Sequence, residues 1–135
     1  MTPEALNAKV SKLAMTVVRD DRWGGAADYL GVAVLGMILY GYALAVGRLV
    51  MLLEIECVAK ATEKVLVEVV GAASKWSEGL VRDAETSAFD RAYHPQQFEL
   101  VGVGHSYYGV NDSSSIVDNV FANIDAVRSR SRAAT

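Results

Sequence analysis

Cysteine is nearly absent from this chain, because Cys57 is the only one among 135 residues. A single cysteine excludes an intramolecular disulfide and a zinc site built from several cysteines. Cys57 also lies beside Glu54 and Glu56, and neighbouring negative charge disfavours the thiolate that a nucleophile requires. We therefore expect a buried structural cysteine, and we expect neither a metal site nor a cofactor.

An excess of positive charge is also missing, since 13 Lys and Arg stand against 16 Asp and Glu, for a net charge of −3. Binding nucleic acid over a broad surface needs a clustered excess of basic residues. Such a cluster occurs at the C-terminus, where Arg128, Arg130 and Arg132 alternate with serine. These arginines are predicted contacts for nucleic-acid phosphate or anionic lipid head groups when many copies line up, and a solvated tail is the alternative.

A recognisable catalytic pattern is missing as well. His94 and His105 fall in a segment rich in loop-forming residues, with Ser106 and Asp112 nearby. A hydrolytic trio sketched from these residues lacks the spacing of a nucleophile elbow and an oxyanion loop. We therefore predict that the chain is not an enzyme. A small hydrolase or ligand-binding domain that uses segment 90–109 is the least favoured function.

Charged residues are absent between Asp28 and Arg48, and this stretch is the main feature of the sequence. Its 19 residues are about enough to cross a hydrocarbon core of roughly 30 Å as a helix. Small residues let helices approach closely, which makes the glycines of the stretch predicted sites of helix packing or self-assembly. These glycines are Gly31, Gly36, Gly41 and Gly47. We predict an apolar helix over about 26–47 that is buried either in a lipid bilayer or against other protein subunits.

The rest of the chain predicts a mainly all-α fold in a single domain, 1–135. Thr2 and Pro3 are typical of a helix start, and an apolar stripe predicts an amphipathic helix from there to about Asp21. The other expected elements are an amphipathic helix 49–82, a loop or short β arm 83–112, a C-terminal amphipathic helix 113–128 and a basic tail 128–135. A continuous rod over 26–82 would measure about 85 Å, too long for a compact monomer, so we expect a break or an extended assembly.

These features favour a non-enzymatic structural subunit that self-assembles through apolar helices, such as a virion coat, a pilin-like filament or a shell protein. The alternative is a single-span membrane protein with a cytoplasmic N-terminus, because Lys9, Lys12, Arg19 and Arg22 precede the apolar stretch. No cleavable signal peptide is expected, since residues 1–22 lack a continuous apolar core. The expected location is a membrane or an extracellular or virion assembly. Expected partners are further copies of the chain, with lipid or nucleic acid as additional ones.

Overall fold

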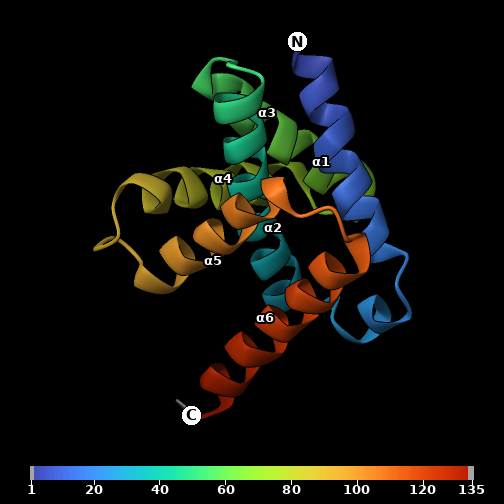
Figure 1. The fold of residues 1–135 in the computed structure, drawn as a ribbon. Helices are drawn as coiled ribbons and strands as arrows, with labels where there is room; N and C mark the ends of the chain where they lie inside the picture. The colour runs from blue at the N-terminus through green and yellow to red at the C-terminus, as the bar shows by residue number, and fades with distance from the viewer. Residues whose placement is uncertain (1, 134–135) are drawn as a thin grey trace.

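Six α-helices and no strand make up residues 2–133, the part of the chain that the computed structural model describes (Figure 1). The all-α fold predicted from the sequence is confirmed. The six helices are α1 (Pro3–Val18), α2 (Tyr29–Leu44), α3 (Ile55–Val65), α4 (Ser74–Phe89), α5 (Pro95–Ser106) and α6 (Ser113–Ala133). Short helical turns lie at η1 (Asp21–Gly25), η2 (Ala45–Val50), η3 (Leu66–Val70) and η4 (Tyr107–Gly109).

Side-chain caps fix where the first two helices begin. The hydroxyl of Thr2 accepts a hydrogen bond from the backbone N–H of Ala5 at 3.2 Å, and Pro3 is the first residue of α1. The carboxylate of Asp28 accepts the backbone N–H of Gly31 at 2.9 Å at the start of α2. Such caps satisfy N–H groups that the first turn of a helix leaves unpaired. The predicted start of the first helix is confirmed.

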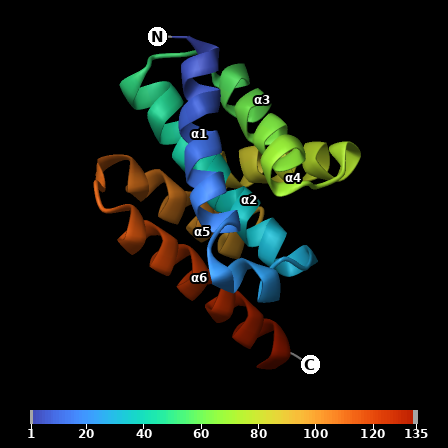
Figure 2. The same ribbon diagram turned by 90° about the vertical axis from the view of Figure 1, so that its right-hand side faces the viewer.

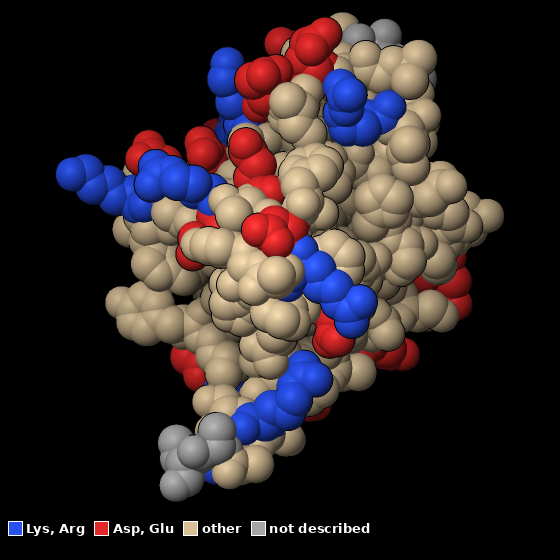
Figure 3. Space-filling model, turned by 90° about the vertical axis from the view of Figure 1, so that its left-hand side faces the viewer, with Lys and Arg blue, Asp and Glu red and all other residues tan. Residues whose placement is uncertain are grey.

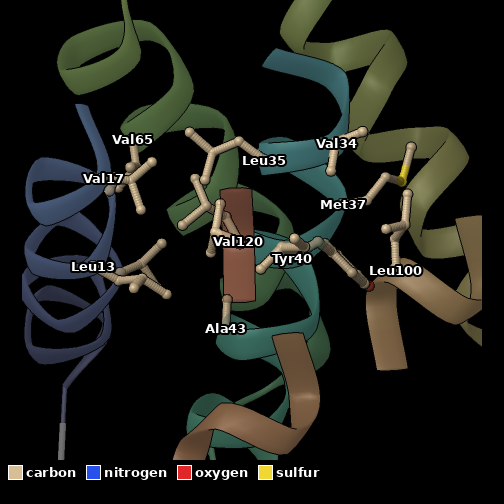
Figure 4. Close-up of a cluster of buried hydrophobic side chains, with 14 of the residues drawn as sticks. Leu13, Val17, Val34, Leu35, Met37, Tyr40, Ala43, Val65, Leu100 and Val120 are labelled. Atoms are coloured by element: carbon tan, nitrogen blue, oxygen red, sulfur yellow. The ribbon is translucent and has the colours of Figure 1, made fainter. Parts of the chain in front are cut away.

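α2 lies at the centre of the bundle and packs against the other five helices. Every residue from 34 to 41 is buried. Figure 4 shows side chains of α2 together with Val17 of α1, Val65 of α3, Leu100 of α5 and Val120 of α6. A helix that is apolar all round is stable in water only where neighbours cover all its sides. The amphipathic helices of the same chain provide this cover, so neither lipid nor a second subunit is needed to bury α2.

The helix formed by α2 and η2 also has the dimensions of a membrane span. Tyr29–Val50 comprises 22 residues with a mean hydropathy of 2.0, and 72% of its apolar 18-residue window is buried inside the fold. A buried core helix and a membrane-spanning helix share this length and composition. Length and hydropathy alone therefore do not assign this helix to a membrane.

Two glycines let α2 and α5 approach each other closely. A Cβ atom on Gly41 would lie 1.9 Å from the carbonyl oxygen of Val101. One on Gly104 would lie 1.8 Å from the carbonyl oxygen of Ile38. Neither helix tolerates a side chain at these points, because its atoms would overlap the backbone opposite. Of the five helices around α2, α5 makes the most extensive contact.

The predicted helix 49–82 is wrong in its extent, because the chain breaks twice within it. α3 begins only at Ile55, and a second break follows η3 at Gly71, whose φ is 87°. The apolar and polar arcs keep the same period across both breaks, so helical periodicity does not reveal them. The chain over 26–82 is therefore broken, which is one of the two outcomes expected for it, and α3 runs back along the bundle instead of extending α2 (Figure 2).

The predicted loop or β arm 83–112 is also wrong. It contains the second half of α4 and all of α5, and no strand occurs in it. His94 caps this helix and Pro95 opens it, while burial against α2 and α4 overrides the strand preference of the apolar run. The last helix extends to Ala133, so residues 128–133 are helical, whereas 134–135 lie outside the described residues.

We expect Gly104→Ala to destabilise the protein by about 2 kcal/mol or more, because the added methyl group would force α2 and α5 apart. Gly102→Ala is the matched control in the same helix, since a Cβ there meets nothing within 4 Å. It should stabilise the fold by up to about 1 kcal/mol through helix propensity. Urea unfolding of the two variants measures both effects. Equal free energies of unfolding for the two variants would contradict the close helix contact.

Tyr40 is fully buried, and its hydroxyl has no hydrogen-bond partner among residues 2–133. Burial, with a smaller contribution from Glu85, raises its pKa well above the usual range. Tyr40→Phe should stabilise the fold by about 1 kcal/mol, since it removes an unsatisfied buried hydroxyl. Tyr107→Phe should instead destabilise it by about 1 kcal/mol, because the Tyr107 hydroxyl donates to Asn119. Thermal and urea unfolding would contradict this account if both variants shifted in the same direction.

Candidate functional site

The four glycines predicted to pack or to self-assemble all face atoms of their own chain. A Cβ on Gly31 would meet the carbonyl oxygen of Ala26, and Gly41 faces α5 as described above. Gly36 faces the side chain of Leu80 in α4, and Gly47 faces side chains of α1 and α3. The close packing that these small residues permit is therefore used within one molecule. Their part in self-assembly stays a prediction.

The three C-terminal arginines have different surroundings. The guanidinium of Arg128 donates two hydrogen bonds to the carboxylate of Asp28, at 2.6 and 3.0 Å, and its side chain is 22% exposed. Arg130 lines a surface groove, and Arg132 lies in the last described turn of α6. Figure 3 shows basic side chains beside the C-terminal end of the chain. Contact with phosphate or lipid head groups stays a prediction, and Arg128 is already held by Asp28.

The residues considered for catalysis are not brought together. His94 caps the start of α5, where its Nδ1 accepts the backbone N–H of Gln97 at 3.1 Å. His105 lies near the other end of α5, about 16 Å away along the helix axis, and its ring packs edge-on to Tyr108. Cys57 is half-buried in α3. Within residues 2–133, no group of three or more His, Cys, Asp or Glu side chains is arranged to hold a metal ion.

A turn with exposed apolar side chains follows α2 on the surface of the bundle. We call residues 48–54 the apolar turn. Within it the side chains of Leu52, Leu49 and Val50 are 80%, 57% and 49% exposed. Figures 1 and 2 show the turn at the end of the bundle near the N-terminus, opposite the C-terminal end of α6. Adjacent exposed aliphatic side chains of this size are typical of a contact surface.

The apolar turn also has an unusual backbone conformation. Leu52 has a φ of 56°, the only positive φ at a non-glycine residue among residues 2–133. The turn is held by hydrogen bonds from the N–H of Leu53 to the carbonyl of Gly47 at 2.8 Å and from the Arg48 guanidinium to the carbonyl of Leu53 at 2.8 Å. The left-handed conformation costs a residue with a Cβ about 1–2 kcal/mol.

The same helix ending occurs a second time in this chain, with glycine in the left-handed position. After η3, Gly71 has a φ of 87°, and the N–H of Ala72 donates to the carbonyl of Leu66 at 2.9 Å. In both endings the residue after the left-handed one bonds to a carbonyl six residues earlier. Glycine is the usual residue here because it adopts a positive φ without steric cost. Leu52 therefore combines a strained backbone with an exposed apolar side chain where glycine would avoid both.

Sequence reasoning missed the apolar turn because it placed residues 49–53 inside a helix. The run Leu49-Val50-Met51-Leu52-Leu53 contains no glycine, proline or asparagine, which are the residues that signal a helix end. Its apolar character was visible, but its exposure depends on where the preceding helix stops.

Comparisons with known protein families, with curated proteins and with solved structures find no match to this chain. Its function is therefore argued from geometry and chemistry.

We expect the Asp28–Arg128 pair to make stability depend on pH below about 4. The hydrogen bonds from Arg128, followed by that from Gly31, hold the pKa of Asp28 well below its usual range. A depressed carboxyl pKa adds stability above the unfolded-state pKa of about 3.9 and loses it as the pH falls further. Asp28→Asn keeps the helix cap but loses the charge, at a cost of about 1 kcal/mol or less because the Asp28 side chain is 55% exposed.

The measurement is urea unfolding of wild type and Asp28→Asn at pH 7 and at pH 3. The difference between the two proteins should shrink at pH 3, and Arg128→Gln should show the same pattern because it removes the same pair. A difference that is equal at both pH values would contradict the assignment.

Proposed function

We propose that this protein is a non-enzymatic structural subunit that associates with further copies of itself, and that the apolar turn forms the contact. The observation that carries this proposal is Leu52, exposed in a left-handed conformation that glycine adopts elsewhere in the chain. Backbone strain of this kind persists where it has a function. Burial of Leu52 against a partner would offset its cost, because a buried leucine side chain gains about 1.5–3 kcal/mol.

The charges that flank the apolar turn favour a second copy as the partner. Arg48 lies at its beginning and Glu54 at its end, and both are exposed. In a two-fold contact the same patch meets itself with reversed direction. Two apolar turns meeting in this way would place Arg48 of one copy near Glu54 of the second copy. The apolar side chains between them would meet without a like-charge pair.

A polymer such as a virion coat, a pilin-like filament or a shell needs a second contact on each subunit, because one two-fold contact closes after a dimer. The turn between α4 and α5 offers such a surface. Phe89 and Tyr93 there are 68% and 52% exposed. This turn projects from the side of the bundle in Figure 1, away from the apolar turn. Regular polymers in electron micrographs of the purified protein would support this extended form of the proposal.

A single-span membrane protein is the second candidate, and the length and hydropathy of Tyr29–Val50 favour it. Spanning a bilayer would require α2 to leave the other five helices, whose inward apolar stripes would then need new cover. Carbonate extraction of membranes from expressing cells tests this candidate. A span withstands carbonate and is released by detergent, whereas a peripheral or soluble subunit is removed by carbonate alone.

We expect Leu52→Asn to weaken self-association while making the single subunit more stable. Asparagine tolerates the left-handed conformation better than leucine, so the free energy of unfolding should rise by a few tenths of a kcal/mol to about 1 kcal/mol. Loss of the apolar contact should shift the dissociation constant of the oligomer by about tenfold or more. Sedimentation velocity over a range of concentrations measures the second effect, and urea unfolding of the dissociated subunit measures the first.

Phe89→Ser is the matched control for sedimentation, because it removes a similarly exposed apolar side chain at a different surface. It should leave the dimer formed by the apolar turn intact and weaken only assembly beyond the dimer, because Phe89 belongs to the proposed second contact. A wild-type protein that stays monomeric at every concentration would refute the proposed function. So would an oligomer that Leu52→Asn leaves unchanged.

A further inference from the structure

A groove beside the first half of α2 lies apart from the apolar turn. It has a volume of about 620 Å³ and lies between the first half of α2, the start of α4, the start of α5 and the C-terminal half of α6. Its apolar lining includes Leu30, Ala33 and Met37 from α2, Trp76 from α4 and Leu100 from α5. This volume falls in the range of sites that bury small ligands, roughly 300–1,000 Å³.

The polar groups of the groove present donors. The Nδ1 atom of His94 accepts the N–H of Gln97, which leaves the ring proton on Nε2. The side-chain oxygen of Gln97 accepts from the Ser87 hydroxyl at 2.7 Å, which leaves its amide group as a donor. The indole of Trp76 carries a donor and no acceptor. Gln96, Ser131 and the hydroxyl of Tyr29, which carry both kinds of group, complete the polar lining.

One cation stands at the groove without an opposite charge. Arg130 lines it, and no Asp or Glu side chain is among the lining residues. The neighbouring arginine of α6, Arg128, is already paired with Asp28. No hydrogen bond or ion pair joins the Arg130 guanidinium to another group within residues 2–133. A guanidinium in this position matches one carboxylate in charge and in hydrogen-bond geometry.

We propose that this groove binds a small molecule with one carboxylate and a hydrocarbon body, of the fatty-acid class. The hydrocarbon would lie against Leu30, Met37 and Leu100, and the carboxylate would accept hydrogen bonds from Arg130. Two observations favour this ligand over a phosphate ester: a single unpaired cation faces the groove, and most of its lining is apolar. The donors on His94 and Trp76 suit the same acceptor group.

The probe is dodecanoate, titrated below its micelle concentration by isothermal calorimetry, with dodecanol as the uncharged comparison. Dodecanoate should bind, and dodecanol should bind about tenfold or more weakly, because it lacks the charge-assisted hydrogen bonds. Arg130→Gln should weaken dodecanoate by about tenfold and leave dodecanol unchanged. Arg91→Gln is the matched control, since Arg91 is an exposed arginine outside the groove whose guanidinium packs over Phe98. It should change neither affinity.

A second measurement locates the ligand without relying on a substitution in the groove. The chain has two tryptophans, Trp23 and Trp76, so its NMR spectrum contains two indole N–H signals, and Trp23→Phe assigns them. Dodecanoate should move the Trp76 signal and leave that of Trp23 in place. Absence of binding, equal affinity for dodecanoate and dodecanol, or an unmoved Trp76 signal would each overturn the proposal. These results do not depend on whether the protein self-associates.

Discussion

The structure depends on one constraint, the burial of a helix that is apolar on every side. α2 offers no polar face to water, so it fixes the number and placement of its neighbours before any finer packing is considered. Five other helices surround it, and one of them, α5, approaches so closely that glycine is required on both helices at the contact. The architecture is therefore a shell of amphipathic helices around a single apolar one. In this chain of 135 residues, all five remaining helices serve as cover for α2.

Local physical signals allowed part of this fold to be predicted. The Thr2-Pro3 opening, the uncharged stretch and the apolar stripe of α6 each follow from capping chemistry or helical period, and each corresponds to a helix in the structure. The ends of the helices were harder to predict from the sequence. Gly71 ends a helix and Gly79 lies in the middle of one, although both are glycines in an amphipathic pattern. What separates them is tertiary packing around the turn, which a single sequence does not encode locally.

The candidate sites were less predictable than the fold, for a related reason. Leu52 carries none of the usual marks of a turn, so its left-handed backbone emerges only from the way η2 ends. The groove combines Trp76, His94 and Arg130, which are separated by many residues and gathered only when α4, α5 and α6 assemble around α2. The two features lie towards different ends of the same helix. A contact between subunits at one end would leave the groove at the other end accessible, so the proposed self-association and the proposed ligand binding are compatible in one molecule.

Most of the helices that cover α2 are synthesised after α2 itself. α2 and η2 are complete at Val50, whereas four of the five helices that cover α2, namely α3, α4, α5 and α6, are made afterwards. At about 5–20 residues per second, the ribosome needs several seconds to finish the chain. During that interval α2, which has the hydropathy of a membrane span, lacks most of the helices that cover it in the folded protein. Transiently exposed apolar surface promotes aggregation, so productive folding of this protein depends on how soon its C-terminal half covers α2.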